Sequence, residues 1–222
     1  MGKYKVVEIF TSINGEGRRA GQLAVFVRFQ RCNLQCAYCD TRWANTETAA
    51  YKEFTAEELY SCIKKTGIQN VTLTGGEPLL QQDIGELLHR LAADKALSVE
   101  IETNGSISIA AFCGMANPPS FTLDYKLPGS GMESMMNTDN YQYLKPQDTV
   151  KFVAAGMDDL ERARQIIERY RLTEKCAVYF SPVFGAIAPE AIVEFMKRYR
   201  LNGVNLQLQL HKLIWDPQRR GV

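Results

Sequence analysis

The sequence predicts an α/β fold: a partial, open βα barrel of about six mainly parallel strands with reduced crossover helices, in a single domain over residues 1–222. Short apolar, strand-like runs alternate with segments of helical period. Polar or glycine-rich residues follow several of these runs directly, where parallel sheets bind their ligands. The strands are too few for a closed eight-stranded barrel, and residues 106–120 and 127–147 show no clear helical period.

The individual elements follow from local pattern. Lys5–Ile13 is a first strand and Asn205–Leu210 a last one. Between them we expect strands at Leu23–Phe29, Asn70–Thr74, Ser98–Thr103, Phe121–Asp124, Thr149–Val153 and Cys176–Phe180. Helices are expected after the capping box Thr55–Glu58, over Leu79–Leu91, over Asp158–Tyr170 and over Pro189–Tyr199.

Composition excludes several classes of protein. The net charge of +1 provides no basic field for nucleic acid, and no apolar run reaches the roughly 20 residues of a membrane span. The N-terminal residues lack the apolar region of a signal peptide, so we expect a cytoplasmic protein. Cys62, Cys113 and Cys176 are scattered in apolar surroundings, and we expect them to be reduced core residues.

Three cysteines lie close together directly after Leu23–Phe29. Cys32, Cys36 and Cys39 have the spacing C-x3-C-x2-C, and such a loop can turn three thiolates toward one soft metal centre. Structural zinc normally has four protein ligands, and a four-cysteine cluster leaves no iron free. No fourth ligand is close in the sequence, so we expect a [4Fe–4S] cluster with one open iron. A partial zinc site is the alternative.

This spacing, with Tyr38 before the third cysteine, resembles the radical S-adenosylmethionine (SAM) superfamily. The resemblance implies that SAM binds the open iron and is cleaved to a 5′-deoxyadenosyl radical by an electron from the reduced cluster. It makes the three cysteines cluster ligands essential for catalysis. It also implies that Tyr38, Cys39 and Asp40 lie against SAM.

Further strands end in groups that could bind this cofactor. Gly75–Pro78 follows a strand and resembles the GGEP motif of the superfamily, whose glycines leave backbone groups bare while Glu77 could receive the SAM ammonium. Glu102–Gly105 and Asp124–Lys126 offer groups suited to a ribose and a carboxylate. The expected SAM-binding residues here are Gly76, Glu77, Thr103, Asp124, Tyr125 and Lys126. A tight turn, caps and salt bridges are the alternatives.

The loop after the first strand is a candidate substrate site. Gly15 and Gly17 flank Glu16, so the backbone can approach a ligand and aim a carboxylate at it. An ordinary hairpin loop with a solvated acid is the alternative. Arg28 lies within a strand on the same face as Phe26, where it requires an acidic partner or an anionic ligand.

One family resemblance covers nearly the whole chain. The segments Glu8–Gly17, Gly21, Phe26–Arg28, Cys36–Thr41, Thr74–Pro78 and Gln209–Lys212 resemble the 7-carboxy-7-deazaguanine synthase family. Asn14 stands where that family more often has glutamine, and Asp124–Lys126 differs from the Ser-Pro-Lys form of some members.

The resemblance implies a reaction that spacing alone does not. The adenosyl radical abstracts the C6 hydrogen of 6-carboxy-5,6,7,8-tetrahydropterin, the ring contracts, ammonia leaves, and SAM is regenerated. The product, 7-carboxy-7-deazaguanine, feeds deazapurine and queuosine synthesis. Mg²⁺ is expected to bridge the substrate carboxylate and carbonyl to Thr41. The implied substrate-binding residues are Ile13, Asn14, Gly15, Glu16, Arg28, Thr74 and Glu102, with Glu16 at the guanidine-like edge.

Two other functions remain open at this point. A glycyl-radical-enzyme activating protein shares the cysteine spacing but needs a wide face for a protein loop. A non-catalytic iron–sulfur electron-transfer module would leave Glu77 and the other polar strand ends without a task. For the synthase we expect a flavodoxin- or ferredoxin-type electron donor, a homodimer, and no nucleic-acid or membrane partner.

Overall fold

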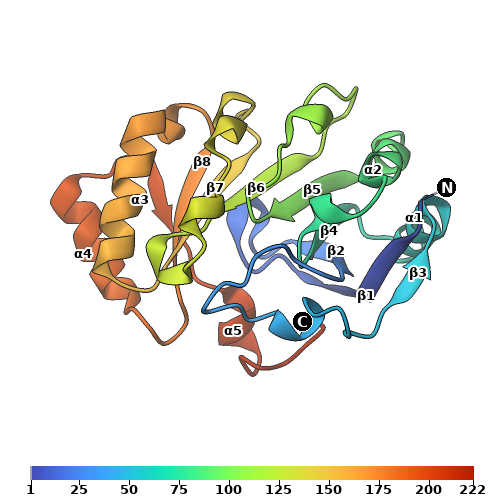
Figure 1. Ribbon diagram of the computed structural model, residues 1–222, viewed down its shortest axis with the longest axis horizontal. Coiled ribbons are helices and arrows are strands. Elements are labelled where there is room, and N and C mark those ends of the chain that lie inside the picture. The colour runs from blue at the N-terminus through green and yellow to red at the C-terminus, as the bar shows by residue number, and fades with distance from the viewer. Residues whose placement is uncertain (1) are drawn as a thin grey trace.

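A computed structural model describes residues 2–222 and contains one nine-stranded sheet (Figure 1). Its order is β3-β1-β2-β4-β5-β6-β7-β8-β9. The strands are β1 (Tyr4–Ile13), β2 (Leu23–Phe29), β3 (Lys52–Phe54), β4 (Asn70–Gly75), β5 (Ser98–Thr103), β6 (Ser120–Tyr125), β7 (Thr149–Ala154), β8 (Ala177–Pro182) and β9 (Val204–Leu206). β1 pairs antiparallel with β2 and β3, and every neighbour pair from β2 to β9 is parallel.

The predicted class, a partial open βα barrel, is confirmed, but the expected number of about six strands was too low. Two antiparallel strands extend one edge, and β3 had no clear sequence signal because it has only three residues. The last strand was predicted over Asn205–Leu210 but ends at Leu206. Beyond it the backbone turns toward the first loop, where the Leu210 N–H donates to the Gly15 carbonyl (3.1 Å).

Four helices of nine or more residues and one short helix accompany the sheet in residues 2–222. They are α1 (Ala56–Lys65), α2 (Ile84–Ala92), α3 (Met157–Tyr170), α4 (Pro189–Tyr199) and the short α5 (Leu210–Ile214). The predicted capping box before α1 is confirmed, with the Glu58 N–H donating to Thr55 Oγ1 (3.3 Å). Residues 106–120 and 127–147 contain no α-helix, only short 3-10 turns and, at Ser120, the start of β6, as their lack of helical period predicted.

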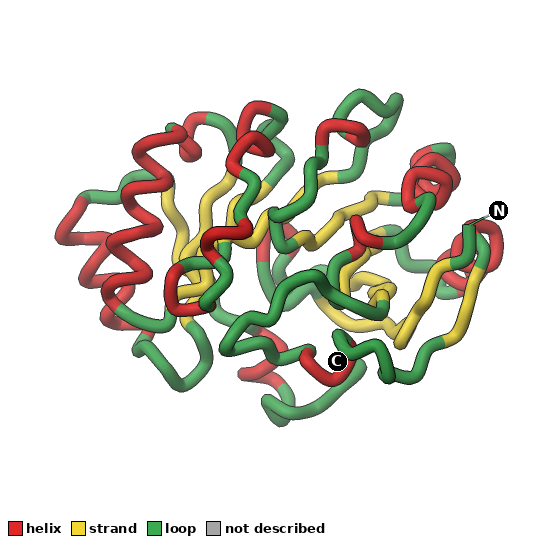
Figure 2. The backbone as a smooth tube through the Cα atoms, in the orientation of Figure 1, coloured by secondary structure: helices red, strands yellow, loops and turns green. Residues whose placement is uncertain are grey.

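The two faces of the sheet differ in chemistry because strand residues alternate. Residues such as Leu73, Phe152 and Phe180 point to the helix-covered face, and each is completely buried. They belong to two apolar clusters that together extend along the face. Figure 2 shows α3 and α4 packed outside the strands on this side.

The opposite, concave face carries polar side chains. Cross-strand partners there include Arg28 with Thr74 and Asp124 with Lys151. Because the strands from β2 on are parallel, their carboxyl ends meet at one edge, and the cysteine loop leaves β2 at that edge. In Figure 1 this light-blue segment crosses the front of the open side, near α5.

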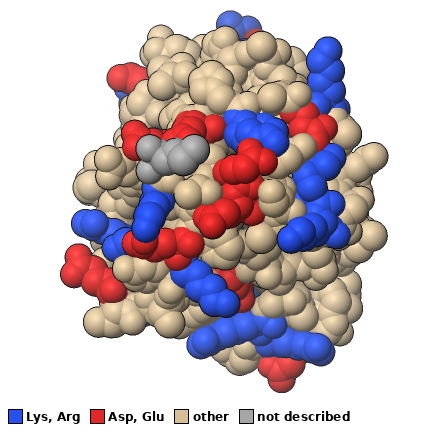
Figure 3. All heavy atoms as spheres, turned by 90° about the vertical axis from the view of Figure 1, so that its right-hand side faces the viewer, with Lys and Arg blue, Asp and Glu red and all other residues tan. Residues whose placement is uncertain are grey.

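The outer surface on the side of α1 and β3 mixes charges of both signs (Figure 3). The exposed pair Lys3–Glu53 (3.1 Å) joins the start of the chain to β3. The pair Arg90–Glu57 (2.6 Å) joins α2 to α1. Exposed pairs of this kind each contribute about 1 kcal/mol or less to stability. None of the helices in residues 2–222 is long and apolar enough to cross a membrane.

Candidate active site

The cysteine loop follows the end of β2 directly. Cys36 is buried, Cys32 and Cys39 are half-buried, and all three are free thiols. Burial raises the pKa of Cys32 and of Cys36, while the Lys126 ammonium acts in the opposite direction on Cys36. Within residues 2–222, no three His, Cys, Asp or Glu side chains are close enough to hold a single metal ion. Three thiols without a fourth protein ligand suit a [4Fe–4S] cluster with one open iron better than a structural zinc, which normally has four protein ligands.

The two glycines of Gly75–Pro78 have a packing role that the sequence did not indicate. A Cβ on Gly76 would lie 1.8 Å from the Arg31 carbonyl oxygen, and one on Gly75 would lie 2.4 Å from Phe29 backbone atoms. The Gly76 N–H donates to the Phe29 carbonyl (3.1 Å) and the Glu77 N–H to the Arg31 carbonyl (2.9 Å). The glycines therefore let this loop press directly against the base of the cysteine loop.

Glu77 was predicted to receive the SAM ammonium, and in the structure its side chain has several protein partners. Its side chain is completely buried and accepts hydrogen bonds from the Leu79 N–H (3.0 Å), the Thr103 hydroxyl (2.8 Å) and the Asn104 N–H (2.7 Å). Burial raises its pKa against these donors. Glu77 thus joins the end of β4 to the end of β5. The Thr103 hydroxyl, also a predicted SAM contact, serves the same internal link.

The side chain of Tyr125, another predicted SAM contact, also has protein partners. Its ring packs on the helix-covered face, 5.5 Å from the Phe152 ring, and its hydroxyl donates to Glu133 (2.7 Å). Strand alternation puts it on the opposite face from its neighbour Asp124. Only the backbone of Tyr125 can serve a ligand on the concave side.

Other predicted SAM residues do gather near the cysteine loop. Lys126 pairs with Asp124 (2.8 Å), and this carboxylate raises the lysine's pKa although burial lowers it. The Tyr38 hydroxyl donates to the Val153 carbonyl at the end of β7 (3.1 Å). Asp40 is exposed and lies 3.4 Å from Lys212. These contacts bring the ends of β6 and β7 and the C-terminal segment to one rim.

On the substrate side, Glu16 is held by residues from three strands or their ends. Glu16 Oε2 pairs with Lys151 (3.1 Å), and Oε1 accepts from Ser181 (2.8 Å) and Gln207 (3.2 Å). Lys151 also lies 3.2 Å from Asp124, so one buried ammonium joins the candidate substrate and SAM residues. Although burial opposes it, Asp124, Glu16 and Glu102 together raise the pKa of Lys151 well above its usual value.

Two unsatisfied polar atoms face the same concave region. Asn14 Oδ1 accepts from Thr72 (2.9 Å), but its buried Nδ2 has no partner in the described residues, and neither does the buried Ser12 hydroxyl. Buried donors without partners are rare in folded proteins. A ligand that supplies an acceptor here would satisfy them.

Arg28, Thr74 and Glu102 also face the concave side. Arg28 has a protein partner, Glu8 (2.7 Å), which meets the predicted need for an acid. The Thr74 hydroxyl donates to Glu102 (2.6 Å), and burial raises the pKa of Glu102. Gly15 lies against His211, since a Cβ there would be 2.6 Å from the His211 Nδ1 atom.

Sequence reasoning missed Lys151, Ser181, Gln207 and His211 as members of this site. Lys151 did carry a signal, because a lysine between Val150 and Phe152 in a strand must have a charged partner. Ser181 and Gln207 carry no such signal, since polar side chains are common at strand ends, and His211 stood out only as part of the family-like segment Gln209–Lys212.

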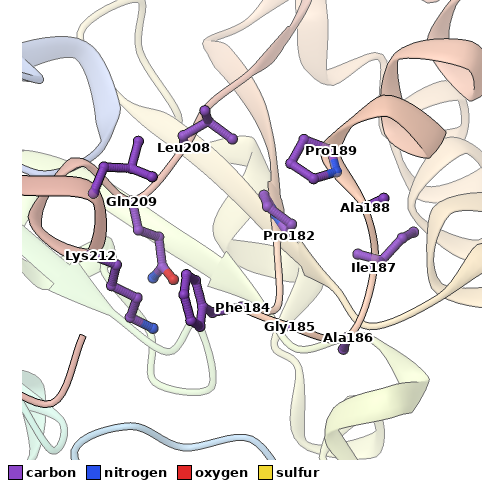
Figure 4. Close-up of a pocket in the computed structure, with 11 residues that line it drawn as sticks. Pro182, Phe184, Gly185, Ala186, Ile187, Ala188, Pro189, Leu208, Gln209 and Lys212 are labelled. Atoms are coloured by element: carbon purple, nitrogen blue, oxygen red, sulfur yellow. The ribbon is translucent and has the colours of Figure 1, made fainter. Parts of the chain in front are cut away.

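A separate hollow of about 470 Å³ lies between the loop after β8 and the segment that leads into α5 (Figure 4). Its lining is largely apolar, with Phe184, Ile187 and Leu208 among the residues, and Lys212 points across it toward Phe184. None of the predicted site residues lines it. This hollow is therefore separate from the polar residues of the concave face.

Comparison with known proteins identifies the superfamily, the family and the fold. Residues 26–122 match the Radical SAM superfamily. The chain is 56% identical to the 7-carboxy-7-deazaguanine synthase of Clostridium acetobutylicum, covering 99% of each chain. It is 35% identical to that of Leptospira interrogans, covering 98% of each. In fold it is similar to the crystal structure of QueE from Escherichia coli, with a TM-score of 0.73, 21% identity, and coverage of 93% and 94%.

The open barrel and the three-cysteine loop define a radical SAM enzyme, a class that carries a [4Fe–4S] cluster and uses SAM. The 56% sequence identity to one synthase over nearly the full length of both chains narrows this class to one family. The chain belongs to the 7-carboxy-7-deazaguanine synthase family.

Proposed function

We propose that the enzyme converts 6-carboxy-5,6,7,8-tetrahydropterin to 7-carboxy-7-deazaguanine by radical ring contraction with release of ammonia, for queuosine or other deazapurine synthesis. When bound, the cluster and SAM supply the adenosyl radical that starts the reaction. The observation that carries the proposal is the charged concave face, because Lys151 joins the Glu16 loop to the Asp124–Lys126 pair beside the cysteines.

The chain's own residues would bind and orient the pterin on this face. The Nδ2 of Asn14, which has no partner in the described residues, can donate to a ring carbonyl, and Ser12 and Thr74 offer hydroxyls on the same face. Glu16, fixed by Lys151, Ser181 and Gln207, can accept from the amino edge of the pterin. Arg28, already paired with Glu8, keeps donors for the substrate carboxylate. Ile13 and Gly15, the chain neighbours of Asn14, would offer backbone groups to the same substrate.

The Cys39–Thr41 turn supports a metal-assisted form of the reaction. Thr41 precedes a 3-10 turn without capping it, and its hydroxyl lies 3.7 Å from the Cys39 sulfur. One hydroxyl binds Mg²⁺ weakly, so we expect the ion to bind together with substrate oxygens. Thr41→Ala should weaken the Mg²⁺ dependence of turnover and leave SAM affinity intact. The exposed Thr48→Ala is the matched control, and loss of SAM affinity in the Thr41 variant would contradict the metal role.

The direct test is an anaerobic product assay. Reconstituted protein is mixed with dithionite, SAM and the tetrahydropterin, with and without Mg²⁺, and the product is identified by mass spectrometry. Formation of 7-carboxy-7-deazaguanine without net SAM consumption is expected. SAM cleavage that needs a partner protein instead of the pterin would favour a glycyl-radical activator, and no cleavage at all would favour an electron carrier.

The setting of the enzyme is part of the same proposal. All six cysteines are free thiols, which supports a reducing compartment such as the cytoplasm. We expect a homodimer of single-domain chains and a flavodoxin- or ferredoxin-type reductant. Size-exclusion chromatography with light scattering and reduction assays with each carrier test these points.

A further inference from the structure

Two asparagine side chains point their amide groups at the cysteine sulfurs. Asn45 Nδ2 lies 3.3 Å from Cys39 Sγ, and Asn104 Nδ2 lies 3.5 Å from Cys32 Sγ. The Leu34 N–H also donates to Cys32 (3.4 Å). Both asparagines come from outside the cysteine loop.

The Asn104 amide is held in one orientation. Its Oδ1 accepts from the N–H (3.0 Å) and the hydroxyl (2.6 Å) of Ser106, so its Nδ2 must face Cys32 and Asn33. Its backbone N–H donates to the buried Glu77 carboxylate. The donor is therefore fixed before any cofactor binds.

The Asn45 amide has a simpler environment. Its Nδ2 donates to Cys39, and its buried Oδ1 has no partner in the described residues. A neutral thiol is a weak acceptor, so this contact alone poorly explains the burial of an amide. A thiolate bound to iron carries negative charge and accepts an N–H strongly.

We propose that Asn45 and Asn104 are positioning residues for the cluster that this family carries. Their N–H groups hold the Cys39 and Cys32 thiolates in place and stabilise the reduced, more negative cluster. Hydrogen bonds to cluster sulfurs raise the reduction potential, so the two amides make the cluster easier to reduce. The inference rests on the cluster of the proposed function and not on the pterin reaction.

The test is a potentiometric titration of the reconstituted protein, followed by electron paramagnetic resonance without SAM or substrate. Asn45→Ala and Asn104→Ala should each lower the reduced-to-oxidised ratio at a fixed solution potential by about three- to tenfold, where tenfold equals 59 mV for one electron. Asn33→Ala is the control, because it removes loop hydrogen bonds to Asn104 and Ser106 but no N–H donor to sulfur. Its ratio should not fall.

Asn45→Ala is the decisive variant, because the only hydrogen bond of its side chain in the described residues is the one to sulfur. A full complement of iron and sulfide with the parent ratio would overturn the proposal. If thermal melting shows that Asn104→Ala does not fold, the Asn45 variant alone decides. A folded Asn45 variant that cannot retain iron supports the positioning role. Shifted potentials without pterin turnover would sink the proposed function and leave this inference intact.

Discussion

The two faces of the sheet are stabilised by different interactions, as the adjacent residues Lys151 and Phe152 show. On the helix-covered face, Phe152 is buried among apolar side chains, where area removed from water stabilises the fold. One position earlier, Lys151 is almost as buried on the concave face but depends on Glu16 and Asp124. The first face can be filled by any well-packed apolar side chains. The second must balance charge and still leave polar atoms free for a ligand.

The largest expected effect is a loss of catalysis that leaves folding unchanged. Cys36→Ala should abolish SAM cleavage and leave the chain folded, because the cysteine loop lies at the rim and not in the core. Cys176→Ala is the matched control: that thiol is equally buried, 9% exposed against 8%, but lies beside the start of β8. It should keep cleavage and lose about 1 kcal/mol of stability. Cleavage with an intact cluster spectrum in the Cys36 variant would disprove its role as ligand.

The next effect compares the two faces directly. Lys151→Met and Phe152→Ala should each lower the free energy of unfolding by about 3–5 kcal/mol, the first by stranding buried carboxylates and the second by leaving a cavity. They differ in pH dependence. The pKa of Asp124 is lowered by its two lysines despite burial, so its contribution is present above its unfolded pKa and is lost as pH falls.

Urea unfolding from pH 7 down to about pH 4 separates the two. The deficit of Lys151→Met should shrink as the pH falls, because the stranded carboxylate takes up a proton. The deficit of Phe152→Ala should stay constant. Equal pH profiles would remove the distinction between the faces.

A smaller effect concerns the close contact between Gly76 and the base of the cysteine loop. Gly76→Ala should cost about 3 kcal/mol or more and reduce iron uptake, since its Cβ would collide with the Arg31 carbonyl. Gly114→Ala is the control: a Cβ on Gly114 would have no atom within 4 Å apart from its chain neighbours, so this variant should change stability by about 0.5 kcal/mol or less. Iron content and urea midpoints measure both. Normal iron uptake by the Gly76 variant would show that the rim tolerates displacement.

The smallest effect is the titration of Glu102. Burial raises the pKa of Glu102, so the folded chain binds this proton more tightly than the unfolded chain does. The contribution of Glu102 to the stability of the parent protein therefore falls as the pH rises above the pKa of an unfolded glutamate, about 4.3. Glu102→Gln keeps an acceptor for Thr74 and lacks the titration. The variant should therefore gain stability relative to the parent as pH increases.

Sequence patterns predicted the apolar face better than the polar one. Alternation and helical period depend on local residues, so the strands up to β8 other than β3, and the helices other than α5, were recognisable. The protein contacts of Glu77, Thr103 and Tyr125 were not, because a motif reveals which groups are present and not which parts of the protein they contact. Lys151 and Gln207 meet Glu16 only through the three-dimensional sheet. β3 and α5 were too short to carry a period.

The link between Gly17 and Gln207 joins residues 190 positions apart. During synthesis the cysteine loop leaves the ribosome long before the segment that anchors Glu16. A nascent chain can therefore present its thiols while the opposite wall is still missing. Iron delivered at that stage would reach the cysteine loop before the C-terminal segment is in place. The active site would be completed only after the final strand has been translated.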